Sequence, residues 1–121
     1  MSNLNKIADR CEAALGPDRD IDCVIGVAIG RFIAEPPRYD GGDIRYREGN
    51  SWPGQAGDML VPAYSSRIDA ASTLVQEGQD WTVGRKSGLS FALVDGHERR
   101  GMTPALALSS AALAARAARS T

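Results

Sequence analysis

Residues 80–94 read DWTVGRKSGLSFALV, and this stretch decides the fold. In the segment 80–85, Trp81 and Val83 share one face of an extended chain, and residues 89–94 form a nearly continuous apolar run. The intervening Lys-Ser-Gly at 86–88 predicts a hairpin with a three-residue connection. Residues 98–102 are expected to add a third strand. Because these strands follow one another directly, they predict a small antiparallel meander.

The last helix is predicted to begin at Thr103-Pro104 and to run to Arg119. Threonine is a favourable N-cap, and proline suits the first helical position because its missing N–H has no partner there anyway. The helix is rich in alanine, and small side chains let a helix lie close to a sheet. We therefore expect this helix to pack directly on the meander.

Two helices are expected at the N-terminal end, arranged as a hairpin. The first is predicted over Asn3–Leu15, with Ser2 as its N-cap and Gly16 as a left-handed stop. The second is predicted from Arg19 to about Phe32, opened by Pro17 and Asp18, with acidic residues in its first turn where the helix dipole favours them. With no export signal visible, Cys11 and Cys23 are expected to be reduced and buried rather than joined in a disulfide.

Between these helices and the meander, residues 34–62 are rich in Gly and Pro and predict a long loop. Within it, the alternation over 43–47 is consistent with a short edge strand. A third helix is expected from Ser66 through Val75. Ser66 and Asp69 have the spacing of a capping box, and Gly78 is expected to end this helix.

The element order predicts one α+β domain spanning residues 1–121, a layered α/β/α sandwich with a small antiparallel β-meander between helices. The chain is 43% hydrophobic and 24% charged, an ordinary mix for a globular fold. Its formal net charge of −1 gives no bulk attraction to nucleic acid or to an acidic membrane, so neither is an expected partner. No window reaches the roughly 18 apolar residues of a membrane helix. We expect a cytoplasmic protein.

Catalytic groups are sparse in this sequence. His97 is the single histidine, and in the segment 95–98 it is expected to be a solvated turn residue. No G-x-S-x-G motif occurs, and the acids at 18, 20 and 22 lack the glycine and glutamate that complete a calcium loop. We therefore predict no enzyme, no metal and no cofactor.

Arginines and aromatic residues suggest an anion site instead, because guanidinium groups pair with oxyanions and rings stack on flat bases. Two candidate groups lie at the starts of the last and third helices, where free main-chain N–H groups also favour anions. A third group lies in the long loop. The candidate residues are Arg99, Arg100, Thr103, Tyr64, Ser66, Arg67, Arg45, Arg47, Tyr46 and Trp52. The alternative is that the charges are solvated surface residues and that Tyr64 and Trp81 belong to the core.

Several segments of the second half match a known pattern: VPAYSSRIDAA at 61–71, LVQEG at 74–78, then Trp81, and TPALAL at 103–108 before an Ala/Arg tail. With these segments the chain resembles the phage ABA sandwich domain, a group of small phage and prophage proteins. The likeness is loose over 1–15 and good over 61–119, with Gln76 where many relatives have proline. It implies a sheet held between helices, and a phage protein in an infected bacterial cell, but it implies no activity.

The first functional hypothesis is a non-enzymatic counter-defence protein, a sponge that sequesters a nucleotide-derived immune signal such as a cyclic nucleotide or an ADP-ribose-like molecule. Because such sites often lie between subunits, this hypothesis includes a homo-oligomer. The alternative is an interaction module that binds and inhibits a host protein through the 34–62 loop, with Trp52, Tyr46 and Arg47 as anchors. A third hypothesis, a nucleotide-processing enzyme that uses His97 as its acid or base, has the least support.

Overall fold

The computed structural model describes residues 3–30, 38–40, 43–47 and 58–119. In chain order its elements are the helices α1 (Asn3–Ala13) and α2 (Arg19–Ala28), the strands β1 (Arg38–Asp40), β2 (Asp43–Arg47) and β3 (Asp58–Leu60), the helix α3 (Ile68–Ser72), the strands β4 (Trp81–Lys86), β5 (Leu89–Val94) and β6 (His97–Gly101), and the helix α4 (Pro104–Arg119). The predicted α+β class, with helices layered against an antiparallel meander, is confirmed.

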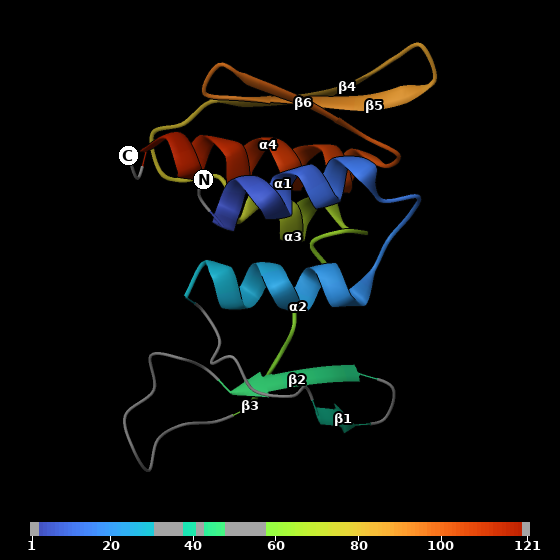
Figure 1. The fold of residues 1–121 in the computed structure, drawn as a ribbon, viewed down its shortest axis with the longest axis vertical. Helices are drawn as coiled ribbons and strands as arrows, with labels where there is room; N and C mark the ends of the chain where they lie inside the picture. The colour runs from blue at the N-terminus through green and yellow to red at the C-terminus, as the bar shows by residue number, and fades with distance from the viewer. Residues whose placement is uncertain (1–2, 31–37, 41–42, 48–57, 120–121) are drawn as a thin grey trace.

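The three strands of the meander pair in the order β4-β5-β6, all antiparallel. Figure 1 shows α4 lying against this sheet, α1 beside α4, α2 further away, and the β1–β3 sheet at the opposite end of the molecule. The elements that carry most of the core are therefore the meander, α1, α3 and α4. Ile21 and Ile25 of α2 complete that core from the far side.

Both turns of the meander are two residues long, Ser87-Gly88 and Asp95-Gly96, and all four residues have positive φ angles. Such turns twist in the sense that antiparallel strands require. The predicted three-residue connection is therefore wrong, because Lys86 still pairs with Leu89 inside the ladder. His97 is likewise the first residue of β6, opposite Val94 and half-buried, rather than a solvated turn residue.

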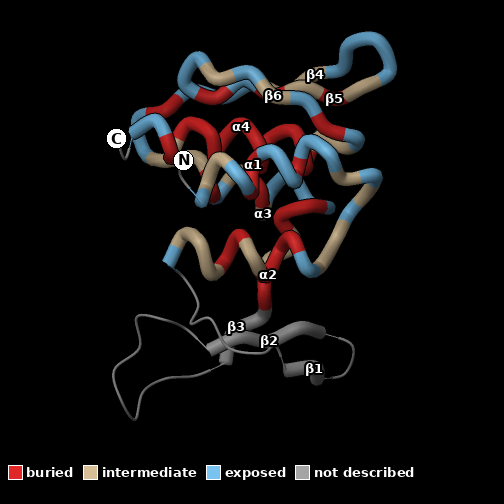
Figure 2. Tube along the Cα trace, in the orientation of Figure 1, coloured by how far each residue is buried: buried red, intermediate tan, exposed pale blue. Residues whose placement is uncertain are grey.

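Helix α4 begins where the sequence predicted. Thr103 is its N-cap, with Oγ1 accepting the Leu106 N–H at 3.1 Å. The helix is buried from Ala105 through Ala115, and Figure 2 shows this burial along most of its length. Its serines fix neighbouring segments: Ser109 Oγ donates to the Tyr64 carbonyl at 2.9 Å, and Ser110 Oγ donates to the Ala8 carbonyl at 2.7 Å. The meander, α1 and the segment before α3 are thus all attached to one central helix.

Gly101, at the end of β6, allows the close approach of sheet and helix. A Cβ atom at this position would lie 2.7 Å from the Ala107 main-chain nitrogen and 3.1 Å from its Cα. These are main-chain atoms, which cannot rotate away as a side chain can. Glycine is therefore required here by contact rather than by its φ angle.

The ends of the N-terminal helices differ from prediction. α1 ends at Ala13, and Gly16 is not left-handed; instead Gly30, with φ of 81°, follows α2, which ends at Ala28 rather than near residue 32. Asp18 caps α2 as expected, accepting the Asp20 N–H at 2.8 Å. Ser2, the predicted cap of α1, lies outside the described residues.

Helix α3 has only five residues and is preceded by Arg67, whose side chain makes no cap bond. The predicted capping box at Ser66 is wrong, because the Ser66 and Arg67 N–H groups both bind the Ala63 carbonyl in a turn before the helix. Gly78 has a left-handed conformation, with φ of 85°, but α3 ends at Ser72 rather than beyond Val75, so the prediction that Gly78 ends this helix is wrong.

A second sheet, β1-β2-β3, occupies part of the predicted long loop. Residues 43–47 do form a strand, but β2 is the central strand of three rather than an edge strand. Two of these strands have only three residues, so they carry too few positions to show a period against the surrounding Gly and Pro.

A buried carboxylate joins α2 to the chain before α3. Asp22 is fully buried; its Oδ2 binds Arg19 Nη1 at 2.7 Å and its Oδ1 accepts the Ser65 N–H at 2.7 Å. Arg19 Nη2 continues to the Val61 carbonyl at 2.8 Å. Because each group has its partner, the charge is satisfied inside the protein and fixes α2 against residues 61–65.

Candidate functional site

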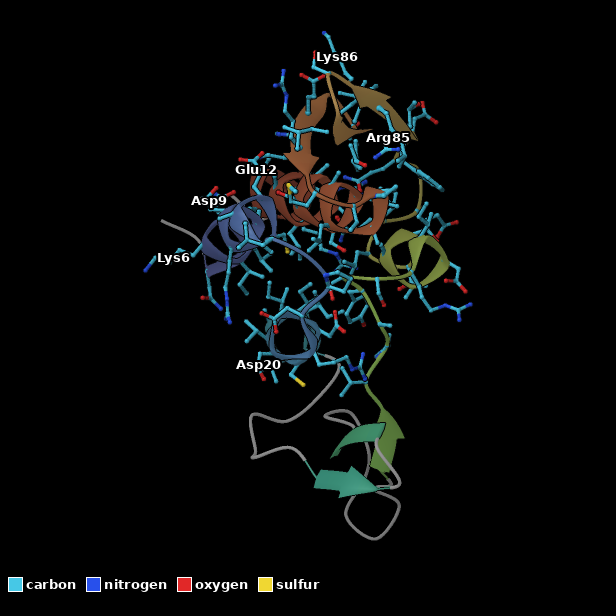
Figure 3. The ribbon with its side chains drawn as sticks, turned by 90° about the vertical axis from the view of Figure 1, so that its right-hand side faces the viewer. Lys6, Asp9, Glu12, Asp20, Arg85 and Lys86 are labelled. Atoms are coloured by element: carbon cyan, nitrogen blue, oxygen red, sulfur yellow. The ribbon has the colours of Figure 1, made fainter. Side chains whose placement is uncertain are left out.

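Arg99 and Arg100 point to opposite faces of the meander, because successive side chains of a strand alternate. Arg99 lies on the helix side, where Nη1 binds Asp9 Oδ1 at 2.8 Å and lies 3.8 Å from Glu12 Oε1. Arg100 is exposed opposite Phe91, and its main-chain N–H donates to Glu12 Oε2 at 3.2 Å. Figure 3 shows Asp9 and Glu12 together on α1. The carboxylates of Asp9 and Glu12 thus bind groups of Arg99 and Arg100, and the two arginine side chains do not form one site.

Thr103 is the third predicted residue at this helix start. Its hydroxyl accepts from the Leu106 N–H and donates to the Ser65 carbonyl at 3.3 Å. Both roles are structural, and they tie the start of α4 to the segment before α3.

The predicted group at the start of α3 is also separated. Tyr64 is fully buried in the core, as the alternative interpretation predicted, whereas Ser66 and Arg67 are exposed. Arg67 binds Asp69 through Nε and Nη2, both at 3.0 Å. This bidentate bond lowers the pKa of the Asp69 carboxyl and raises that of Arg67. The Arg67 guanidinium already has an anionic partner within the chain.

The loop candidates belong to the second sheet or lie outside the described residues. The main chain of Arg45, Tyr46 and Arg47 forms β2, with Arg45 opposite Leu60 and Arg47 opposite Asp58. Figure 1 places this strand at the far end of the molecule from α4 and the meander. Trp52 lies outside the described part of the chain. The ten predicted residues therefore do not share one location among the described elements.

The structure instead groups side chains on the face of the meander turned away from α4. We call it the open face, and its residues follow from the strand register: Thr82, Gly84, Lys86, Leu89, Phe91, Leu93, Glu98 and Arg100. Phe91 lies over Gly84, so close that a Cβ there would be 2.8 Å from the ring. Leu93, near one end of the central strand β5, is 40% exposed.

A hollow of about 210 Å³ lies at one end of the open face, lined by Asp80, Trp81, Thr82, Leu93, Asp95 and Gly96. Trp81 is 42% exposed, so the expectation that it belongs to the core is corrected. The turn is held by the Asp95 N–H, which donates to the Asp80 carbonyl at 3.0 Å, and by Gln79 Nε2, which is 3.5 Å from Asp95 Oδ2. The exposed Leu93 side chain beside the Asp80 and Asp95 carboxylates suits an apolar group next to a cation.

Sequence reasoning missed this face because the apolar run 89–94 suggested cover on both sides of its strand. The signal was present in the neighbouring strands: Thr82, Glu98 and Arg100 all share the face of Leu93 once the register is known. Polar residues on both flanking strands indicate solvent on that side.

The remaining chemical groups are internal. Cys11 and Cys23 are buried, as predicted. Burial raises the pKa of the Cys11 thiol to about 12, and the Asp22 carboxylate adds to the effect. A thiol that stays protonated at neutral pH is a poor nucleophile.

Comparison with protein-family models, with curated proteins and with solved structures finds no match for this chain. No helix within residues 3–30 or 58–119 is long and apolar enough to cross a membrane.

Proposed function

We propose that this chain is a non-enzymatic interaction module, a phage accessory protein that binds another protein through the open face of its meander. The observation that supports the proposal is the 40% exposure of Leu93 beside a hollow, on a face that also carries Leu89 and Phe91. Exposed apolar side chains gathered on one face beside a concavity mark interaction surfaces. The phage setting, in the cytoplasm of an infected bacterium, comes from the resemblance to the phage ABA sandwich domain.

The partner chemistry follows from the hollow. Its lining includes the exposed Leu93 side chain, which favours an apolar group, and Asp80 and Asp95, whose carboxylates attract a cation. A lysine or arginine next to that apolar residue would meet both attractions. We therefore expect a partner segment with a bulky apolar residue flanked by a basic one.

Sequestration of a nucleotide-derived signal stays a prediction from the sequence. The described residues that motivated it point to separate faces or already bind carboxylates. The hollow on the open face is rimmed by acids, which repel phosphate. The interaction module proposed here corresponds to the second hypothesis from the sequence, except that its contact surface is the meander instead of the 34–62 loop.

The test is selection of displayed random peptides on the immobilised protein, compared with the variant Leu93→Glu. We expect enriched peptides with an apolar residue beside Lys or Arg, and loss of their binding in the variant. Leu15→Glu is the matched control, because Leu15 is also exposed, at 89%, but lies outside the meander. Peptides that bind all three proteins equally, or no enrichment at all, would refute the proposal.

Calorimetric titration with cyclic nucleotides and ADP-ribose gives the competing outcome. Tight binding that disappears in Arg99→Ala and Arg100→Ala, but persists in Leu93→Glu, would restore the sponge hypothesis in place of the module.

A further inference from the structure

The two edge strands of the meander differ in how far the rest of the protein covers them. At β6, the outward Arg100 N–H is taken by Glu12 of α1, and Arg99 is bound to Asp9. At β4, the other edge of the sheet, residues 81, 82, 85 and 86 are exposed. A sheet edge with unpaired main-chain groups is a template for a further strand.

The hydrogen-bond pattern identifies the outward groups of β4. The Asp95 N–H donates to the Asp80 carbonyl, and bonded pairs alternate along an antiparallel ladder. Thr82, Gly84 and Lys86 therefore bond to β5, whereas Trp81, Val83 and Arg85 direct their N–H and C=O groups away from the sheet. The alternation repeats along the whole strand, so a full set of donors and acceptors faces outward.

We infer that β4 pairs antiparallel with β4 of a second copy of this chain, in the register that places Val83 opposite Val83. A two-fold axis perpendicular to the sheet at this point matches each outward main-chain group with its counterpart. The three strands of each copy become one continuous sheet, with the helices of both copies on the same side. The charges favour a second copy of this chain as the partner, because a strand with opposite charges at its two ends is complementary to an antiparallel copy of itself.

The charges at the two ends of β4 satisfy that condition, because Asp80 directly precedes the strand and Lys86 is its last residue. In this register Asp80 of one copy lies opposite Lys86 of the other, and both belong to the solvent side of the ladder. Figure 3 shows Lys86 pointing away from the helices. On the helix side, Trp81 lies opposite Arg85 of the second copy, where the guanidinium can stack on the exposed indole. The symmetry repeats both contacts.

Moving the two-fold axis by one residue along β4 removes these contacts. With Gly84 at the centre, Lys86 would face Thr82 and Asp80 would face Gly88; with Thr82 at the centre, Asp80 would face Gly84. Only the Val83 register sets opposite charges side by side, so the charges select it. The dimer would present two open faces on one side. The inference shares Asp80 with the hollow of the proposed function but does not use Leu93, so Leu93→Glu separates the two proposals.

Sedimentation equilibrium over a wide protein concentration range tests the dimer. We expect the wild-type mass to rise from that of one chain to that of two. Val83→Pro removes an outward N–H without taking a bond from β5, and proline is tolerated at such edge positions. It is expected to weaken dimerisation by roughly tenfold or more. Far-ultraviolet circular dichroism and a melting curve establish that the variant is folded.

A charge exchange gives a second, independent readout. Asp80→Lys alone and Lys86→Asp alone place like charges opposite each other and are expected to weaken the dimer, whereas the double variant restores attraction and dimerisation. Leu93→Glu is expected to dimerise as the wild type does. A wild type that stays monomeric throughout, a double variant no better than the single ones, or loss of the dimer only in Leu93→Glu would each overturn the inference.

Discussion

Replacing Asp22 tests how strongly the buried carboxylate holds α2 against the rest of the molecule. Asp22→Asn keeps the size of the side chain and an oxygen that can accept the Ser65 N–H, now 2.7 Å from Oδ1. It removes the charge opposite Arg19, whose Nη1 is 2.7 Å from Oδ2. The substitution thus separates the ion pair from the packing around it.

The expected loss of stability can be bounded from the structure. Removing one partner of a fully buried ion pair costs about 3–5 kcal/mol. Asp22 has no exposed side-chain surface, but the Arg19 side chain is 40% exposed, so water solvates the guanidinium once its partner is gone. We therefore expect Asp22→Asn to lower the free energy of unfolding by about 2 kcal/mol. For a domain of this size that corresponds to a fall of about 6–10 °C in the melting temperature.

Urea unfolding followed by circular dichroism measures the change, with a thermal melt as a second readout. Asp20→Asn is the matched control: Asp20 lies in the same first turn of α2, but it is exposed and no ion pair of the described side chains involves it. Its loss should cost about 0.5 kcal/mol through the helix dipole alone. If the two variants unfold at the same urea concentration, the ion pair contributes nothing beyond that dipole term and the argument is wrong.

Two further predictions concern α1 and α4. Burial raises the pKa of the Cys11 thiol from 9.0 to about 12, so the thiol loses its proton at lower pH in the unfolded chain than in the folded one. The contribution of Cys11 to the free energy of unfolding is therefore fully present below pH 9 and falls between pH 9 and 12 by about 1.4 kcal/mol per pH unit. Urea unfolding of wild type and Cys11→Ala across this range should show that extra slope only in the wild type, and parallel curves would contradict it. Thr103→Ala removes the acceptor of the Leu106 N–H and should cost about 1 kcal/mol in the same assay, with Ser66→Ala, which caps nothing, as the unchanged control.

The start of α4 could be predicted from the sequence because its cause is local. Thr103 bonds the N–H three residues ahead and Pro104 is preset for the first turn, so neither needs the rest of the fold. The helix-like spacing of Ser66 and Asp69 failed for the opposite reason. There the Ala63 carbonyl takes the N–H groups of Ser66 and Arg67, and a turn forms where a cap was expected.

Of the two turns of the meander, the sequence clearly indicates the type of only one. Asp95-Gly96 is one of the commonest pairs in a two-residue turn, and reading it that way assigns His97 to a strand at once. Ser87-Gly88 is a weaker signal, because serine seldom has a positive φ, and a longer connection therefore looked equally natural.

The predicted anion site failed on a point that the sequence already contained. Once residues 97–101 form a strand, Arg99 and Arg100 must lie on opposite faces, so they cannot grip one ligand together. What could not be foreseen is the partner of Arg99. Asp9 lies 90 residues away in the sequence, and only the packing of α1 beside β6 brings the two together.

The contrast between the two edges of the meander connects the fold to the inferred assembly. Glu12 satisfies an outward N–H of β6 at 3.2 Å, and a strand arriving there would have to displace it together with the Arg99–Asp9 pair. No comparable side chain is bonded to β4 in the described part of the chain, where the outward groups belong to Trp81, Val83 and Arg85. A sheet open at both edges would grow without limit, whereas a sheet closed at one edge stops when two copies meet. In the assembly inferred here, the acids of α1 would therefore restrict association through β4 to a dimer.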